Sequence, residues 1–425
     1  MTLYLLAFVL FLVIGVPVAL ALGLASLSYL VLTGNLSLLM AFPQRMIGGI
    51  DNFVLLTIPF FILAGNLMNA ANLTEQIVRA AQMLVGRVRG GLAVVNMIAS
   101  MLFSGVSGAA TAEASALGSV MIPAMTKAGY KPAYAAALTA TGSLLGPLVP
   151  PSLALILYGV LTGTSIGDLF LAGILPAVLL CGLLIVYALV KARREGHPVA
   201  EPLPRGERRA AALGAIPALL LPVIIVGGIR SGVFTPTEAA AVAAAYALLI
   251  GVVIYRSLGS RRILNSFYET ATMSAGVMLV VASASMTSFI FGIENIPQTI
   301  AAAILGLTDS TVLLILLLNL VLLVLGFFLE PLAALILVMP ILNELGPAIG
   351  LDPVQFGIMV VFNLMIGMIT PPVGLCLFIV GAIGRVPLDK LSWAALPMIG
   401  ICLAVLMAVS FVPALSLALP RLAGG

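Results

Sequence analysis

The sequence predicts an all-α polytopic membrane protein with two inverted repeats, each containing a re-entrant helical hairpin and a broken transmembrane helix, plus amphipathic interfacial helices. Hydrophobic residues make up 62% of the 425 positions and charged residues only 8%, which is far outside the composition of soluble domains. Two apolar segments are interrupted by proline pairs, at residues 150–151 and 371–372. Proline removes a backbone donor and kinks or unwinds a helix, so both segments should be broken.

The residue composition also excludes several classes of protein. The only histidine is His197, and the three cysteines lie singly in apolar runs, so a metal centre, a disulfide or a Ser-His-Asp triad is not expected. No Gly-rich loop ends in Gly-Lys-Ser/Thr, so ATP hydrolysis is not expected either. The basic residues behind the net charge of +4 lie in short loops beside apolar segments, which sets membrane orientation and does not indicate nucleic-acid binding. We expect no enzymatic activity and no cofactor.

An internal duplication is indicated by residues that recur 221 positions apart. This offset pairs Gly146 with Gly367 and brings the two proline pairs into register. Further matches at this spacing are Gly129 with Gly350, Pro132 with Pro353, Asp168 with Asp389, and Pro176 with Pro397. A slightly smaller offset of 217 pairs Glu113 with Glu330 and Pro123 with Pro340. The recurrence of glycines, prolines and acids at a fixed spacing favours two copies of one unit over chance similarity.

Residues 1–90 are predicted to form scaffold helices and an interfacial arm of the first repeat. Residues 3–32 are an apolar stretch long enough for one tilted span, which is expected to leave the N-terminus in the cytoplasm. Residues 36–50 are too short and too polar to cross, so an interfacial helix is expected there. The chain then returns over residues 52–69 and continues as a surface helix over residues 73–89.

Residues 91–165 are predicted to form the core of the first repeat. Two apolar halves within residues 91–127 flank the small-residue stretch SGVSGAATAE at residues 104–113, and each half is near the lower limit for a full span. A re-entrant hairpin fits these halves better than two crossings. The broken span follows over residues 132–164.

Residues 166–305 are predicted to be scaffold and connecting helices, with a cytoplasmic loop at residues 191–210. Spans are expected at residues 169–192, 213–229, 236–255 and 271–292. The turn Thr-Pro-Thr-Glu at residues 235–238 supplies an N-cap hydroxyl, a proline and an acid for the helix that follows. A second interfacial helix is expected at residues 261–270, separate from the span after it.

Residues 306–390 repeat the core, with a hairpin over residues 311–349 and a broken span over residues 353–384. Residues 391–425 add a C-terminal scaffold helix that spans at residues 393–417. An odd number of crossings between equivalent helices makes the two repeats inverted. Three of the 19 lysine and arginine residues then lie outside: Arg45, Arg230 and Arg421. This asymmetry satisfies the positive-inside rule, and inverted repeats of this kind are typical of secondary transporters.

Each break frees backbone carbonyls, which need a polar partner inside the membrane. A hairpin tip that faces a broken helix supplies several such oxygens without a full charge, which suits a sodium ion. The first cluster combines the tip residues Ser104, Gly105, Ser107 and Gly108 with Gly146, Val149 and Pro151. The second combines Gly326 with Gly367, Thr370 and Val373. Close helix packing is the alternative interpretation of these small residues.

A carboxylate is expected to bind between the tips, because helix N-termini carry partial positive charge and free N–H groups. The nearest hydroxyl and amide groups are those of Ser107, Thr111, Thr141, Ser143 and Asn363. Each of these could instead serve a local backbone hydrogen bond. The intramembrane acids Glu113 and Glu330 are either functional or caps of the hairpin helices. Asp168 and Asp389 are predicted to be N-caps of the helices after the breaks.

Four segments together resemble one transporter family: SGVSGAATAEASALG, GPLVPPSLALILYG, SGVFTPTEAAAVAAAYAL and NLMIGMITPPVGLCLF. They are similar, over nearly the whole chain, to the large membrane subunit of tripartite ATP-independent periplasmic (TRAP) transporters. The resemblance implies a sodium-coupled importer of organic acids that works by an elevator movement in the bacterial inner membrane. It also implies two partners, a small four-helix membrane subunit and a periplasmic substrate-binding protein. No four-helix domain precedes residue 3, so the small subunit is expected to be a separate chain.

The resemblance implies the sodium ligands as well. The first site would use Ser104, Gly146, Val149 and Pro151, and the second Gly326, Gly367, Thr370 and Val373. An ion or anion channel lined by the same breaks is the alternative function, and an intramembrane hydrolase is disfavoured because no base is available. The organic acid stays open among dicarboxylates, sialic acid, 2-oxo acids and sugar acids.

Overall fold

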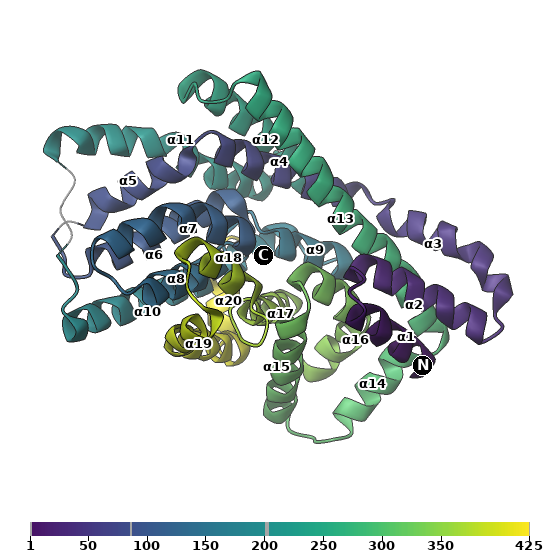
Figure 1. The fold of residues 1–425 in the computed structure, drawn as a ribbon. Coiled ribbons are helices and arrows are strands. Elements are labelled where there is room, and N and C mark those ends of the chain that lie inside the picture. The colour runs from purple at the N-terminus through teal and green to yellow at the C-terminus, as the bar shows by residue number, and fades with distance from the viewer. Residues whose placement is uncertain (1, 86, 200–203, 425) are drawn as a thin grey trace.

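Figure 1 shows the fold of the chain in a computed structural model. It describes residues 2–85, 87–199 and 204–424; the remaining residues, including 200–203 of the predicted loop at 191–210, lie outside the described part. Within the described residues every long element is an α-helix, which confirms the predicted all-α class. Eight of these helices are long and apolar enough to cross a membrane, so the chain is a multi-pass membrane protein.

The helices follow the order of the two predicted repeats. In the first half they are α1 (Thr2–Val13), α2 (Val18–Leu32), α3 (Ala41–Ile50), α4 (Thr57–Ala70), α5 (Leu73–Val85), α6 (Gly91–Ser107), α7 (Ala110–Lys127), α8 (Pro132–Gly142), α9 (Leu153–Thr162) and α10 (Ile166–Glu195). In the second half they are α11 (Arg205–Arg230), α12 (Pro236–Leu249), α13 (Ser260–Ile293), α14 (Ile296–Leu305), α15 (Thr311–Phe328), α16 (Pro331–Ile349), α17 (Pro353–Gly367), α18 (Leu375–Gly384), α19 (Leu388–Phe411) and α20 (Pro413–Leu422). Short helical segments with other hydrogen-bond patterns are η1 (Leu36–Met40), η2 (Phe53–Leu56), η3 (Ser143–Leu145) and η4 (Ile250–Ile254).

The predicted single span over residues 3–32 is wrong, because the structure forms two helices there. The turn between α1 and α2 contains Gly15, whose φ of +86° lies in the left-handed region, a conformation that glycine adopts at little cost. Tyr4 on α1 and Ser26 on α2 both hydrogen-bond with the hydroxyl of Thr287, at 2.9 and 3.3 Å. Because positions 4 and 26 are equally distant from Gly15, α1 and α2 form an antiparallel hairpin.

Two other predicted boundaries are also wrong. Residues 260–293 form one continuous helix, α13, where an interfacial helix and a separate span were expected. No proline or glycine lies between Arg261 and Ala271 to end the helix, so it continues through the polar stretch. The last span ends at Phe411, because Pro413 lacks an N–H donor and begins α20. Helix α14, which has ten residues, was not predicted.

The aspartates after the two breaks are not N-caps. Ser165 caps α10, and its hydroxyl accepts a hydrogen bond from the amide of Asp168 at 3.3 Å. The carboxylate of Asp168 instead pairs with Arg230 at 3.1 Å. Asp389 lies in the first turn of α19, which begins after Pro387. Both acids therefore face a helix N-terminus from within its first turn, where negative charge is also favourable.

Both predicted hairpins and both broken helices are confirmed. α6 and α7 meet at residues 108–109, and α15 and α16 meet at residues 329–330. The breaks separate α8 from α9 and α17 from α18, and each contains a cis Pro-Pro peptide bond. Gly129 and Gly350, shortly before the broken helices, both have a left-handed backbone, with φ of +94° and +75°. The two copies therefore agree in backbone conformation at the offset found in the sequence.

The two broken helices run antiparallel, and two contacts show this. Tyr158, near the end of α9, donates a hydrogen bond of 3.0 Å to the carbonyl of Pro353 at the start of α17. At the other end, a side chain on Gly384, the last residue of α18, would lie 3.6 Å from the Cβ atom of Ala136 in α8. The end of each broken helix thus meets the beginning of the other, as inverted repeats require.

The remaining helices surround these two cores. α4 packs against both α12 and α13, and α2 and α3 pack along the long α13 (Figure 1). α10 packs along α6 and α20, while α19 packs along α8 and α17, so both helices lie against the hairpins and broken helices. The division into core segments (91–165 and 306–390) and scaffold segments stays a prediction.

We expect the N-terminus and Asn35 to lie on the same side of the membrane, because the α1–α2 hairpin returns the chain to its starting side. Cysteines placed in a short N-terminal tag and at position 35 should therefore react with a membrane-impermeant maleimide from one and the same side. Intact cells and inverted vesicles provide the measurement, in a variant without the three buried native cysteines. Labelling from opposite sides would instead support a single span over residues 3–32.

Candidate functional site

The tip of the first hairpin lies directly against the first broken helix. Gly108 turns the chain between α6 and α7 with a φ of +62°, and its carbonyl accepts a hydrogen bond from the amide of Leu153 at 3.4 Å. A side chain at Gly108 would overlap the carbonyl oxygen of Pro151. Glycine is therefore needed here both for the turn and for the close approach of the tip to the break.

Two residues predicted for the first sodium site, Ser104 and Gly146, meet at the carboxylate of Glu113. The Ser104 hydroxyl donates to Glu113 Oε2 at 2.9 Å, and a Cβ atom on Gly146 would stand 3.0 Å from the same oxygen. Val149 and Pro151 follow on the same break, and both are buried. The structure thus brings Ser104 and Gly146 together at an acid, Glu113, and places Pro151 against Gly108 of the hairpin tip.

In the second repeat, two of the four predicted sodium-site residues are in contact. Gly326 and Gly367 touch through their backbones, since a Cβ atom on Gly367 would overlap the carbonyl of Gly326. The Thr370 hydroxyl donates to the carbonyl of Ile366 at 2.7 Å, and the side chain of Val373 is 38% exposed. Hairpin tip and broken helix therefore meet in the second repeat as they do in the first.

The two breaks differ in how deeply they lie. Every residue from 143 to 153 is buried, whereas residues 370–373 are half-buried or exposed. Several buried oxygens near these segments have no hydrogen-bond partner among the described residues, namely Ser107 Oγ, Glu113 Oε1 and Asn363 Oδ1. Buried polar groups are normally paired. Free oxygens beside freed carbonyls fit a hard cation such as sodium, which takes oxygen ligands.

The five residues predicted to bind a carboxylate fall into two groups. Thr141 and Ser143 lie inside the broken helix and donate to the carbonyls of Ala137 and Ala140, at 2.9 and 2.8 Å. Asn363 is fully buried in α17 and donates to Asn319. Ser107 and Thr111 lie at the hairpin tip and are half-buried. Among the described residues no hydrogen bond joins any two of these five side chains, and their role in binding stays a prediction.

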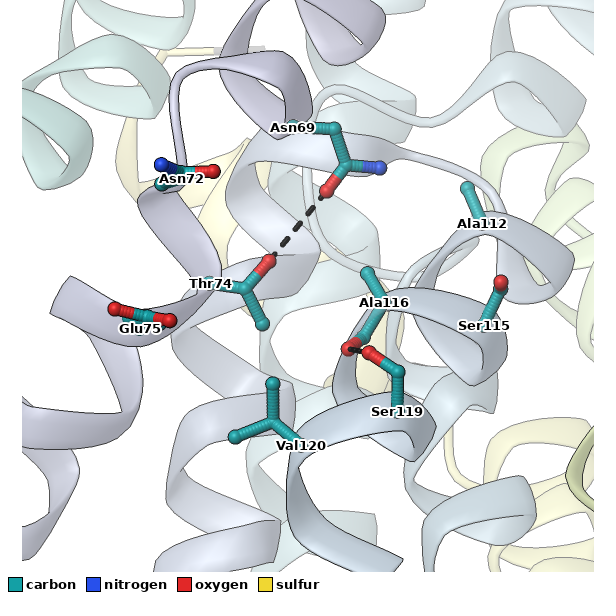
Figure 2. A pocket seen from close by; sticks show the side chains of 9 residues that line it. All are labelled: Asn69, Asn72, Thr74, Glu75, Ala112, Ser115, Ala116, Ser119 and Val120. Atoms are coloured by element: carbon teal, nitrogen blue, oxygen red, sulfur yellow. Dashed lines mark hydrogen bonds between the residues drawn. The ribbon is translucent and has the colours of Figure 1, made fainter. Parts of the chain in front are cut away.

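A polar cavity of about 430 Å³ lies between the first hairpin and the turn that joins α4 to α5 (Figure 2). Asn69, Asn72, Thr74 and Glu75 line one wall, and small residues of α7 line the other. A second polar cavity of about 380 Å³ shares Asn69 and Asn72 and extends to Arg262 on α13. The first cavity places polar groups at the boundary between α7 and the α4–α5 turn, whereas the second lies between α4 and α13.

Sequence reasoning missed these cavities, and only a weak signal pointed to them. Asparagines recur at positions 66, 69 and 72 near the end of an otherwise apolar helix. Asn66 bonds to Thr270 of α13 at 3.0 Å, and Asn69 accepts from Thr74 at 3.5 Å (Figure 2). Their clustering depends on α4, α5, α7 and α13 converging, which no local pattern predicts.

Comparison with known proteins gives a matching family, two similar relatives and one similar solved structure. The family described as tripartite ATP-independent periplasmic transporter, DctM component, matches residues 5–415. The sialic acid TRAP transporter large permease protein SiaM of Vibrio cholerae is 44% identical over 408 residues, which cover 96% of this chain and 95% of that protein. The C4-dicarboxylate TRAP transporter large permease protein DctM of Pseudomonas aeruginosa is 38% identical over 400 residues, covering 92% and 94%. The crystal structure of the Alcanivorax borkumensis YdaH transporter has a similar fold, with a TM-score of 0.65 and 16% identity over 99% of this chain and 98% of that one.

Replacing Gly367 with alanine should destabilise the folded protein by about 1–3 kcal/mol, the usual range for overpacking, because the new Cβ atom would overlap the carbonyl of Gly326. Gly182→Ala is the matched control, since no atom lies within 4 Å of the position of its Cβ and alanine favours a helix. Thermal unfolding of the purified variants measures both effects. Equal midpoints for the two variants would show that the Gly326–Gly367 contact is not tight.

Proposed function

The chain belongs to the DctM family of tripartite ATP-independent periplasmic transporters, and on this basis we propose that it is the large membrane subunit of a sodium-coupled importer of an organic acid. One observation supports the proposal most directly: two hairpin tips are seated against two broken helices that run antiparallel. Each assembly offers carbonyl and hydroxyl oxygens inside the membrane, as a sodium site needs. Inverted repeats of this kind bind substrate at the repeat interface, near the membrane midplane.

In the proposed mechanism, sodium binds before the substrate. One ion takes oxygens of Ser104, Gly146, Val149 and Pro151, and a second takes oxygens of Gly326, Gly367, Thr370 and Val373. The ions coordinate the freed carbonyl oxygens and hold the tips in place. The free N–H groups of the half-helices then face the substrate carboxylate. Binding of the organic acid therefore depends on prior occupation by sodium.

The movement is proposed to be an elevator, in which the hairpins and broken helices slide as one body against the scaffold. The polar cavity beside α7 supports this proposal, because it leaves the boundary between the first core and the α4–α5 turn incompletely packed (Figure 2). A close-packed apolar boundary would resist sliding, since packed interiors transmit strain and do not deform continuously.

The substrate is proposed to be a carboxylate such as sialic acid or a C4-dicarboxylate, the solutes in the names of the relatives above. A periplasmic binding protein would deliver it, and a small four-helix membrane subunit would complete the transporter as a separate chain. We place the complex in the bacterial inner membrane. We propose that both ends of the α1–α2 hairpin lie on the periplasmic side, in place of the cytoplasmic N-terminus expected for a single span, because the predicted topology of the remaining spans begins on that side.

Uptake of labelled sialic acid or succinate into vesicles should require an inward sodium gradient, the small subunit and the matching binding protein. The physical reason is that sodium orders the tips on which the carboxylate binds. Vesicles with potassium in place of sodium, and vesicles without binding protein, are the controls. Flux that ignores both the sodium gradient and the binding protein would support the channel alternative.

Gly146→Val should abolish sodium-driven uptake while membrane insertion and subunit assembly persist. Its Cβ atom would stand 3.0 Å from Glu113 Oε2 and 3.3 Å from the carbonyl of Ser143, and the two added methyl groups would occupy space beside the predicted ligands. Gly182→Val, on an exposed face of α10, is the control for adding the same side chain. If the Gly146 variant transports normally, the first ion site is wrongly assigned.

A further inference from the structure

Glu113 is a carboxylate enclosed by protein at the tip of the first hairpin. Its exposed fraction is 0%, and its Oε1 atom has no hydrogen-bond partner among the described residues. None of the ion pairs found in the described part of the chain involves Glu113. A buried carboxylate needs a positive partner or a full set of hydrogen bonds, because its desolvation is costly. The side chains in place supply only part of that requirement.

The other carboxylate oxygen lies among residues of the first proposed sodium site. Glu113 Oε2 accepts from the Ser104 hydroxyl at 2.9 Å and is 3.0 Å from the position of a Cβ atom on Gly146. Ser107, on the same hairpin tip, has a second buried oxygen without a partner. Carboxyl and hydroxyl oxygens therefore lie on the hairpin beside the break, and oxygen atoms are the ligands that a small hard cation takes.

Glu330, the equivalent acid of the second repeat, has a different structural role. Glu330 is the N-cap of α16, and its Oε2 atom accepts from the amide of Ala333 at 3.1 Å. α16 begins directly after Glu330, whereas α7 begins three residues before Glu113. Because of this shift, Glu330 caps the first turn of its own helix. Glu113 instead lies within the first turn of α7, and its carboxylate points toward the break.

We propose that the carboxylate of Glu113 is itself a ligand of the cation at the first site, whereas the second site is built from neutral oxygens only. The inference rests on the proposed sodium coupling and adds a charged ligand to it. A carboxylate at 0% exposure strengthens the attraction for a cation, because little water screens the two charges. The first site should therefore hold sodium more tightly than the second.

Sodium binding to the purified transporter tests this without any need for transport. The thermal unfolding midpoint is measured against sodium chloride concentration, with choline chloride keeping the ionic strength constant, for the wild type, Glu113→Gln and Glu330→Gln. Glutamine keeps the shape and one oxygen acceptor in both variants. We expect the sodium concentration for half-maximal stabilisation to rise about tenfold or more in Glu113→Gln, in the range found when groups that support a metal site are changed, and to stay near the wild-type value in Glu330→Gln.

The possible outcomes separate the inference from the proposed function. An unchanged sodium response in Glu113→Gln would overturn the inference and leave Glu113 as a structural acid, while sodium coupling stands. No sodium response in the wild type would overturn sodium coupling itself. Should Glu113→Gln not fold, Glu113→Asp gives the answer: it keeps the charge but withdraws it by one methylene, so a weaker sodium response supports the inference and an unchanged one contradicts it.

Discussion

Free backbone carbonyls inside a membrane are the constraint on which the rest of this structure depends. The proline pairs end each broken helix where no water can take over the lost hydrogen bonds. A hairpin tip packs against each break. Glycines at the contacts, such as Gly108 and Gly367, allow the backbones to touch. The same close approach concentrates oxygen atoms in one place. Pairing of the freed carbonyls and the proposed cation site are thus two consequences of one geometry.

Duplication explains why this geometry occurs twice and in opposite directions. Each broken helix begins beside the end of the other, so the two breaks share one core although they lie 221 residues apart. The two copies are not packed alike, since the first break is buried and the second is partly exposed.

The sequence predicted those parts of the fold that are marked by residues which break, turn or cap a helix. Proline pairs placed the breaks, small residues placed the hairpin tips, and the Thr235 capping box is present as expected. Helix boundaries were predicted wrongly where a turn lies within a uniformly apolar stretch, and where a helix continues through a polar stretch. Gly15 turns an apolar stretch that reads as one span, and the polar start of α13 continues unbroken into its apolar part. The cavity in Figure 2 was out of reach, because it is made by segments that meet only in the folded chain.

Glu113 and Glu330 show how two copies of one unit come to differ without any change of residue type. Both are glutamates at the start of the second hairpin helix, and sequence alone left each as either a functional acid or a cap. The position of the helix start decides between these roles: an acid directly before the first helical residue turns back to cap it, as Glu330 does. One turn further into the helix, the same side chain points away from its own backbone and toward whatever lies opposite the tip, which at Glu113 is the broken helix. A small difference in where a helix begins therefore places one glutamate beside the first proposed cation site and leaves the other as a helix cap.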